Sequence, residues 1–398
     1  MKFIEDINID NKKVILRLDL NVTINDNKIE DDTKIKESLK TINYILDHKC
    51  HVLIMSHLGK IKTKEDEEKN SLRIVGDSLS DLLNKKVNFI PFTRGKELEE
   101  SFINNEITLM ENTRFEDLDS KKESSCDEEL AAYWASLGDI FVNDAFGTTH
   151  RRHASNYGIA KHLESAYGYL IQKEIIGLNP IINEINRPLT IIMGGAKVDD
   201  KIALIKKIIV KTDYLIVGGG IANTFLCAQG YNVGKSLYSK EYVDEIKEII
   251  KQYKDKIIIP IDVVVNPDNT TIKNITDVND NDNICDVGPK TINLYNQVLS
   301  KSHTMFLNGA VGIYEKDDCS TGTKALLEVI SNKDIVKIAG GGDALASINK
   351  FQYENRFNYL STGGGATLSY IANGYLECFE DKLWFLYWIL KWIYPKII

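Results

Sequence analysis

The chain has 398 residues, of which 43% are hydrophobic, and this length predicts more than one domain because a single core rarely grows so large. Its formal net charge of −8 excludes a global basic field for nucleic acid, so any anion site must be built locally from a few cations. The six cysteines form no C-x-x-C pair and the N-terminus has no apolar stretch, which predicts buried, reduced thiols, no secretory signal and a cytoplasmic protein.

Short apolar runs of strand length recur in the first half of the chain. They are Val14–Leu18, His51–Met55, Val87–Phe92, Ile107–Met110 and Ile140–Val142. Segments with helical periodicity lie between most of them, including Thr33–His48 and Asp127–Leu137. This alternation predicts a parallel sheet with helices on both faces, which binds ligands at the carboxyl ends of its strands.

Charged and polar side chains follow these expected strands, and Lys34 lies early in the first helix. The set is Asp19, Asn21, Lys34, His57, Leu58, Gly59, Lys60, Arg114 and Arg151. Any one of these residues alone is more simply explained as a solvated loop residue. Their recurrence at the ends of successive strands favours a ligand-binding site. Cations and imidazoles beside two acceptors suit a small anion with a phosphate, a carboxylate and a hydroxyl. His150 and His153 have no acidic or thiol partner at metal-ligand spacing, which disfavours a metal site.

The second half repeats the pattern with its own strands and helices. The expected strands are Leu189–Met193, Tyr214–Val217, Lys256–Val265, Met305–Leu307, Ile335–Ala339 and Phe357–Leu360, and the helices include Lys201–Lys211 and Lys240–Tyr253. We therefore predict two Rossmann-like α/β domains, over 1–164 and 187–366, each a parallel sheet with helices on both faces. A helical hinge over 165–186 would join them, and an apolar tail would occupy 367–398.

Glycine-rich loops follow the strands of the second half, where they would let backbone N–H groups approach phosphate oxygens. One such run is more simply a tight turn, but four runs favour phosphate binding. The residues expected around a nucleotide are Gly195, Ala196, Lys197, Lys201, Gly219, Asn308, Gly312, Glu315, Gly341, Gly342 and Asp343. Lys197 and Lys201 lie four residues apart, so both can project from one helical face. Asp343 directly follows a glycine run, as a Mg²⁺ ligand beside phosphates would.

Taken together, these segments resemble phosphoglycerate kinase from about residue 12 to residue 367. The strings RLDLN, SHLGK, ENTRF, FVNDAFGTTHRRHAS, GGAKVDDKI, NGAVGIYE and GGGD occur here in the order of that family. The resemblance implies reversible transfer of the 1-phosphoryl group of 1,3-bisphosphoglycerate to Mg-ADP, which gives 3-phosphoglycerate and ATP in glycolysis. It implies a monomer that binds these small molecules and no nucleic acid.

The resemblance also assigns roles to residues. Glycerate binding falls to Asp19, Asn21, His57, Arg114 and Arg151, and nucleotide and Mg²⁺ binding to Lys197, Lys201, Glu315 and Asp343, with Ala344 beside them in place of a threonine. The expected catalytic groups are Lys34, Lys201 and Arg151. Lys34 and Lys60 stand where the family has arginines, and lysine lacks the planar fork that clamps two oxygens. The alternative is therefore a weakly active or non-catalytic paralogue that binds nucleotide, with recruitment by its tail to a membrane surface or a partner as one version.

The last segment departs most from the family. Residues 383–398 are strongly apolar and aromatic, but sixteen helical residues would reach about 24 Å, short of a hydrocarbon core of roughly 30 Å. Three explanations stay open: a changed reading frame at the gene end, a segment docked on the body, and an interfacial membrane anchor. We favour the first two over membrane contact.

Overall fold

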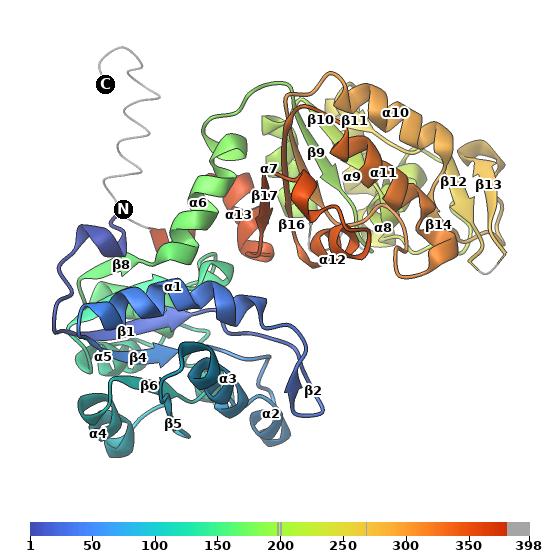
Figure 1. Cartoon of the computed structure of the whole chain (residues 1–398). Helices are drawn as coiled ribbons and strands as arrows, with labels where there is room; N and C mark the ends of the chain where they lie inside the picture. Colours follow the sequence, from blue (N-terminus) through green and yellow to red (C-terminus); the bar gives the residue numbers. More distant parts are fainter. Residues whose placement is uncertain (197–198, 200, 268, 380–398) are drawn as a thin grey trace, which may run out of the picture. The chain divides into compact units, whose positions relative to one another are not determined.

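The computed structural model describes residues 1–379 except 197, 198, 200 and 268. The chain divides into two compact units, residues 1–175 with the segment from 376, and residues 176–375. The division falls inside helix α6, Tyr169–Ile182 (Figure 1).

Unit 1 is built on a six-stranded parallel sheet in the order β5-β6-β4-β1-β7-β8. Its strands are β1 (Lys13–Leu18), β4 (His51–Met55), β5 (Asn88–Ile90), β6 (Ile107–Met110), β7 (Ile140–Asp144) and β8 (Ser165–Tyr167). Its helices before α6 are α1 (Thr33–Asp47), α2 (Lys64–Lys69), α3 (Arg73–Leu83), α4 (Lys96–Asn104) and α5 (Glu128–Ser136). A small hairpin, β2 (Ile24–Asn25) and β3 (Lys28–Ile29), follows β1.

Alternating side chains along β1 and β4 supply the cores on the two faces of this sheet. Val14 and Val52 pack in one core with buried residues of α1 and α3. Ile15 and Leu53 pack in the other with residues of α4 and α5, including Trp134. This follows from the two-residue period of a strand, and it explains why continuous apolar runs form these strands.

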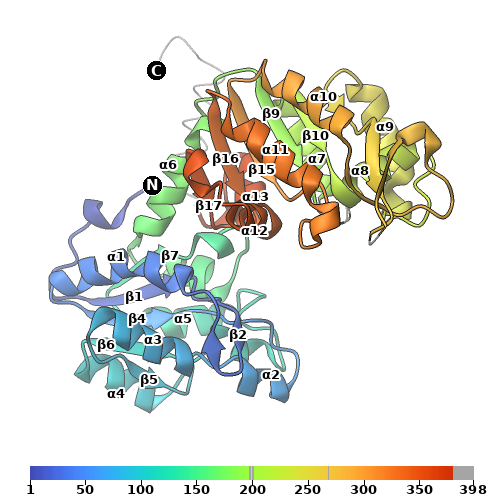
Figure 2. The ribbon, with the colours of Figure 1, turned by 45° about the vertical axis from the view of Figure 1, so that its right-hand side comes forward.

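Unit 2 has a second six-stranded parallel sheet in the order β11-β10-β9-β15-β16-β17. The strands are β9 (Leu189–Met193), β10 (Tyr214–Val217), β11 (Ile257–Ile258), β15 (Thr304–Asn308), β16 (Val336–Gly340) and β17 (Tyr359–Ser361). The helices are α7 (Ile202–Lys211), α8 (Gly219–Ala228), α9 (Val243–Tyr253), α10 (Pro289–Leu299), α11 (Thr321–Ser331), α12 (Gly342–Lys350) and α13 (Gly365–Asn373). Figure 2 shows α10 and α11 beside this sheet, where both contribute to one core with β9, β10 and β15. The predicted α/β class with parallel, helix-flanked sheets is confirmed.

An antiparallel sheet in unit 2 was not expected. It runs in the order β13-β12-β14, with β12 (Asp262–Val265), β13 (Thr271–Asn274) and β14 (Ile284–Val287). The segment Lys256–Val265, expected as one strand, is split into β11 and β12 on either side of Pro260. Proline lacks the N–H that a continuing ladder needs, so the chain leaves one sheet and enters the other.

The segment 165–186, expected to be helical, begins with strand β8 and continues as α6. The carboxylate of Asp144, at the end of β7, accepts hydrogen bonds from the backbone N–H groups of Leu170 (2.8 Å) and Ile171 (3.1 Å). It therefore holds the first turn of α6 instead of joining the polar groups at the neighbouring strand ends.

Gly177 interrupts the apolar run of α6 for a packing reason. A Cβ atom at this position would lie 2.4 Å from Cγ of Tyr359 in β17. A glycine inside a helix costs roughly 1 kcal/mol relative to alanine. Here it allows the aromatic ring to lie directly on the helix backbone.

Among the described residues, no helix is both long and apolar enough to cross a membrane. The first part of the predicted tail, up to Asn373, belongs to α13, and a short turn of 3-10 helix, η10 (Glu377–Phe379), follows. The apolar segment 383–398 lies outside the described residues.

Candidate active site

The carboxyl end of β1 in unit 1 carries a linked set of predicted residues. Nζ of Lys34 donates to Oδ2 of Asp19 at 3.0 Å, and the backbone N–H of Asn21 donates to Oδ1 of Asp19 at 3.3 Å. Oδ1 of Asn21 accepts from the backbone N–H of Gly59 at 2.9 Å. Gly59 has φ +60, and a Cβ there would meet the side chain of Asn70, so this turn requires glycine. The ends of β1 and β4 are thereby fixed against each other.

A second link joins the end of β4 to the segment after β6. The side-chain amide of Asn112 donates to the backbone oxygen of Leu58 at 2.7 Å, and its oxygen accepts from the N–H of Arg114 at 3.0 Å. Asn112 thus caps the short helix η2 (Thr113–Asp117) and holds Arg114, its second residue, at a fixed place beside β4. Leu58 is buried and contributes through its backbone, while the side chain of Lys60 is exposed.

A buried ionic network lies under this edge and was not predicted. Arg17 is fully buried, and its Nε donates to Oγ of Ser155 at 2.8 Å. Ser155 in turn donates to the buried carboxylate of Glu123 through its hydroxyl and through its N–H, the latter at 2.9 Å. The other end of Arg17 lies 3.3 Å from Nδ1 of His57. Arg17 lies inside an apolar strand, and a charged residue at such a position indicates a buried ionic partner. Glu123 lies in a loop without periodicity, so the sequence does not indicate that it is this partner.

The histidines of this edge lie among cations. Burial lowers the pKa of His57 well below its usual value, and the charge of Arg17 lowers it further. Burial and the charge of Arg151 lower the pKa of His150 to about 4, and burial with Arg17, Arg114 and Arg151 lowers that of His153 to about 3. Neutral imidazoles beside the guanidinium groups of Arg17, Arg114 and Arg151 leave positive charge at this edge, which Glu123 and Asp19 offset in part.

Several polar atoms of the edge have no partner. Nε of Arg114 and Nδ1 of His150 are buried and make no hydrogen bond to any residue that the structure describes. Arg151 exposes its side chain and holds its place through its backbone oxygen, which accepts from Asn156 at 3.2 Å. A buried donor without a partner is costly, and an anionic ligand could accept from the Nε–H of Arg114.

Unit 2 contains a cavity of about 490 Å³ at the carboxyl ends of its parallel strands. Six predicted nucleotide residues line it: Gly195, Ala196, Gly219, Gly312, Glu315 and Asp343. These residues form one wall of the cavity, in which the backbone segments lie close together. A Cβ at Gly219 would lie 2.7 Å from the oxygen of Gly195, so this contact requires glycine. A volume in this range suits a drug-sized ligand.

A cation and a carboxylate lie close to Gly195, one of the glycines that line the cavity. Nζ of Lys201 donates to the oxygen of Gly194 at 2.7 Å. A Cβ at Gly195 would lie 3.0 Å from that Nζ and 3.9 Å from Oδ2 of Asp343. Asp343 is exposed in the first turn of α12, which offers backbone N–H groups at its start.

The remaining predicted residues of unit 2 support this arrangement. Asn308 donates to the oxygen of Gly340 at 2.7 Å, while its own Oδ1 is buried without a partner among the described residues. Gly341 has φ +100 and packs on Asn308, and Gly342 opens α12. Ala344 is buried in the core behind Asp343. Lys197 lies outside the described residues.

The opposite wall comes from the unexpected antiparallel sheet. Residues 283–287 of β14 and its flank line the cavity, together with Lys235 and Leu237. Asp286 is buried there, and burial raises its pKa to about 7 although backbone N–H groups oppose the shift. Asp286 accepts from the N–H of Gly322 at 2.6 Å and so holds the start of α11.

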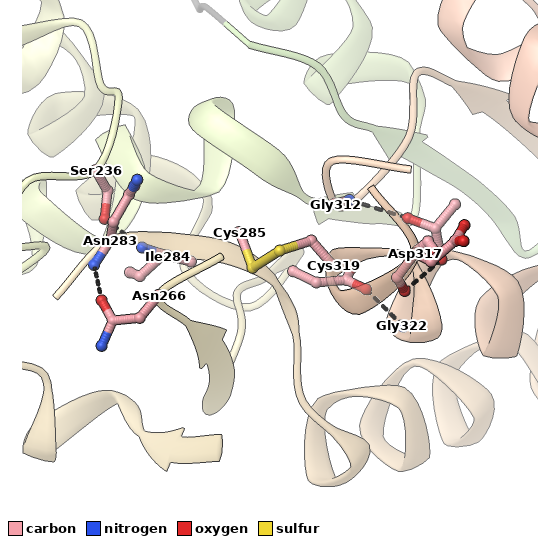
Figure 3. Close-up of a disulfide and its surroundings, with 12 residues drawn as sticks. Ser236, Asn266, Asn283, Ile284, Cys285, Gly312, Asp317, Cys319 and Gly322 are labelled. Carbon is pink, nitrogen blue, oxygen red and sulfur yellow. Dashed lines mark hydrogen bonds between the residues drawn. A yellow bond between two sulfur atoms is a disulfide. The ribbon is translucent and has the colours of Figure 1, made fainter. Parts of the chain in front are cut away.

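The expectation that all six cysteines are free thiols is wrong for two of them. Cys285 and Cys319 form a disulfide, with their Cα atoms 5.5 Å apart (Figure 3). Cys50, Cys126, Cys227 and Cys378 are free. No local pattern predicts the pairing, because the two residues are 34 positions apart in the chain.

The donor set of the cavity fits Mg²⁺ carried by a nucleotide. No group of three or more His, Cys, Asp or Glu that would hold a metal occurs within the described part of the chain. Magnesium is typically held by one or two protein carboxylates while phosphates and waters complete its shell. A single exposed carboxylate, Asp343, beside a glycine loop meets that requirement.

Comparison with known proteins names the family. The family model for phosphoglycerate kinase matches residues 4–374. The chain belongs to the phosphoglycerate kinase family. It is 45% identical to the phosphoglycerate kinase of Staphylococcus haemolyticus over 380 residues, which is 93% of this chain and 96% of that protein. It is 43% identical to the Fusobacterium nucleatum enzyme over 392 residues, or 95% and 98% of the two chains.

Solved phosphoglycerate kinase structures share the fold. The structure from Coxiella burnetii has a TM-score of 0.82 at 36% identity and covers 94% of this chain and 97% of that one. The main functional prediction is confirmed: this is a glycolytic kinase that moves a phosphoryl group between 1,3-bisphosphoglycerate and ADP. The alternative of a non-catalytic paralogue gains no support.

Proposed function

We propose that unit 1 binds the glycerate substrate and that the cavity of unit 2 binds ADP or ATP. The observation that carries this assignment is that Gly195 and Asp343 line a cavity of about 490 Å³ and that Nζ of Lys201 lies beside the same glycine. We assign residues 1–164 to the glycerate domain, 165–186 to the hinge and 187–366 to the nucleotide domain. We further propose a cytoplasmic monomer, since its substrates are small metabolites of glycolysis.

The glycerate site is proposed at the edge formed by β1, β4, β6 and β7. Asp19 and Asn21 would bind the substrate hydroxyl, and His57, Arg114 and Arg151 its carboxylate and 3-phosphate. Two observations support this assignment. The pKa values of His57 and His150 are lowered, so both imidazoles are neutral beside the arginines. The buried Nε–H of Arg114 donates to no described residue and is available to a ligand. Lys60 adds charge from the exposed turn after β4.

Transfer would proceed in line, without a covalent enzyme intermediate, because the site offers cations and oriented N–H groups. The proposed catalytic groups are Lys34, Arg151 and Lys201, cations that would stabilise the charge that develops on the moving phosphoryl group. Mg²⁺, when bound with the nucleotide, neutralises phosphate charge, and Asp343 is the residue that would hold it. Gly341 and Gly342 would let backbone N–H groups approach the phosphates.

A coupled assay of ATP-dependent phosphorylation of 3-phosphoglycerate tests the proposal. We expect turnover that requires both substrates and Mg²⁺. Folded protein without detectable turnover would overturn it. Titration of each substrate separately, followed by protection of unit 1 or unit 2 from proteolysis, tests the assignment of each ligand to its unit.

A further inference from the structure

The disulfide between Cys285 and Cys319 ties together two segments beside the cavity of unit 2. Cys285 lies in β14, and Cys319 ends the short helix η8 (Asp317–Cys319), which precedes α11. Both residues are buried in the folded chain. Figure 3 shows the sulfur bridge between strand β14, which begins at Ile284, and the turn that carries Asp317.

The two sulfurs differ in their access to the cavity. Cys285 is one of the residues that line it, together with its neighbours Ile284 and Asp286. Cys319 is not among the lining residues and is fully buried. A small molecule that enters the cavity therefore meets the Cys285 side of the bond first.

The bridge also fixes the loop that closes the cavity. The N–H of Ile313 donates to the oxygen of Cys285 at 2.8 Å, so the loop of Gly312 to Glu315 is attached to β14 at the cysteine itself. On the other side, a Cβ at Gly312 would lie 2.7 Å from the oxygen of Cys319 and 2.1 Å from Oδ1 of Asp286. Gly312 is thus enclosed by the two bridged segments.

A change at the bridge must reach this loop. Reduction breaks the covalent link between β14 and η8, so that only noncovalent contacts hold these segments together. The backbone of Cys319, which packs on Gly312, is then free to shift against the loop. Interiors packed this closely transmit such shifts to their neighbours.

We propose that Cys285 and Cys319 form a thiol–disulfide exchange site for small thiols and disulfides, whose state is linked to occupancy of the cavity by a nucleoside diphosphate. The bridged form holds the loop of Gly312 to Glu315 in place for the nucleotide, and the nucleotide covers the path to Cys285. The linkage rests on the proposed nucleotide site. Because linkage is reciprocal, a nucleotide that prefers the bridged form also stabilises the bridge.

The exchange uses two equivalents of a thiol. A thiolate attacks Sγ of Cys285, the bond to Cys319 breaks, and Cys319 leaves as a thiolate that takes a proton from solvent. A second thiolate attacks the sulfur that the first one contributed, which releases Cys285 as a thiol and forms the small disulfide. Two electrons pass from the thiols to the bridge, and a small disulfide such as oxidised glutathione reverses both steps.

The experiment compares the oxidised and reduced full-length protein. Protein treated with oxidised glutathione is mapped by differential alkylation and mass spectrometry, and its affinity for ADP is measured by calorimetry before and after reduction. We expect a Cys285–Cys319 bond, ADP binding weaker by about fivefold or more after reduction, and reduction slowed at least tenfold by ADP at about 100 times its Kd. The four free cysteines serve as internal controls for alkylation.

Two variants complete the test. Cys319→Ser is expected to bind ADP like the reduced protein and to be insensitive to glutathione, while Cys50→Ser, a buried free thiol in unit 1, should behave like the unaltered protein. If Cys319→Ser does not fold, reduction of the natural protein gives the same comparison.

The outcomes separate the two claims. Absence of the bond after oxidation overturns the exchange site. Equal ADP affinity in both states, with equal reduction rates with and without ADP, overturns the linkage and leaves the nucleotide site standing. Failure of ADP to bind either state overturns the proposed nucleotide site as well.

Discussion

Nζ of Lys34 lies 3.0 Å from Oδ2 of Asp19, so a cation from the first turns of α1 is held at the carboxyl end of the central strand β1. Asp19 keeps the lysine in place without removing its access to solvent, because about a third of the Lys34 side chain stays exposed. Because Asp19 already holds the Lys34 side chain in place, its ammonium group could contact a phosphoryl group without a further loss of side-chain conformational entropy.

Replacement of Lys34 by methionine should therefore lower kcat more than it raises KM. Loss of a group that stabilises transition-state charge costs on the order of 3 kcal/mol, or about a hundredfold in rate. Steady-state kinetics of the coupled reaction measure the effect. Lys36→Met is the matched control, since Lys36 lies on the same helix in an exposed pair with Asp32. Equal kinetics for the two variants would contradict the role of Lys34.

Replacement of His150 by glutamine should make unit 1 less sensitive to acid. The pKa of His150 is lowered from 6.5 to about 4, so between these values the unfolded chain binds a proton that the folded chain does not. Its contribution to stability is present above pH 6.5 and is lost as the pH falls toward 4. The fall in Tm from pH 7 to pH 5 should thus be smaller in the variant.

The difference between variant and natural protein isolates this effect. Asp144 and Asp286, whose pKa values are raised to about 6 and about 7, act in the opposite direction in the same range, but they are present in both proteins. Parallel Tm profiles for the two proteins would show that His150 titrates normally in the folded state.

Replacement of Asp343 by asparagine should reduce kcat by about a hundredfold and raise the Mg²⁺ concentration needed for half-maximal rate. ADP affinity measured in EDTA should change by less than about twofold, because the carboxylate acts through the metal. Asp334→Asn, which alters an exposed carboxylate of the same unit, is the control. An unchanged Mg²⁺ requirement would exclude Asp343 as the ligand.

Replacement of Gly312 by alanine should destabilise unit 2 and weaken ADP binding. The added Cβ would lie 2.1 Å from Oδ1 of Asp286, and overpacking of this kind costs roughly 1–3 kcal/mol. Thermal unfolding and calorimetry measure the two effects. Gly342→Ala is the control for unfolding, because a Cβ there meets no atom within 4 Å. A normal Tm for Gly312→Ala would show that the loop can move.

The strands, and the sheet edges where the two sites are proposed, were predictable because they depend on local pattern. Val14 and Ile15 face opposite cores, and a continuous apolar run is what a strand buried on both faces requires. Polar residues directly after such runs lie at one edge of a parallel sheet. The pattern alone therefore predicts that Asp19 and Gly59 lie close together.

The remaining features depend on contacts between distant segments. Pro260 was the one local sign that Lys256–Val265 forms two strands. The second sheet could not be predicted without that split, and neither could the position of Cys285 and Asp286 beside Gly312 in the cavity wall. Arg17 and Glu123 were missed because each is an isolated ionic residue whose partner is far along the chain.

The contact between Gly177 and Tyr359 restricts how this sequence can change over evolutionary time. While tyrosine occupies 359, any side chain at 177 would overlap its ring, so position 177 cannot vary first. A smaller residue at 359 would open the space and allow alanine at 177, which favours the helix. The two positions therefore have a fixed order of substitution, and descendants of this chain should lose the tyrosine before they lose the glycine.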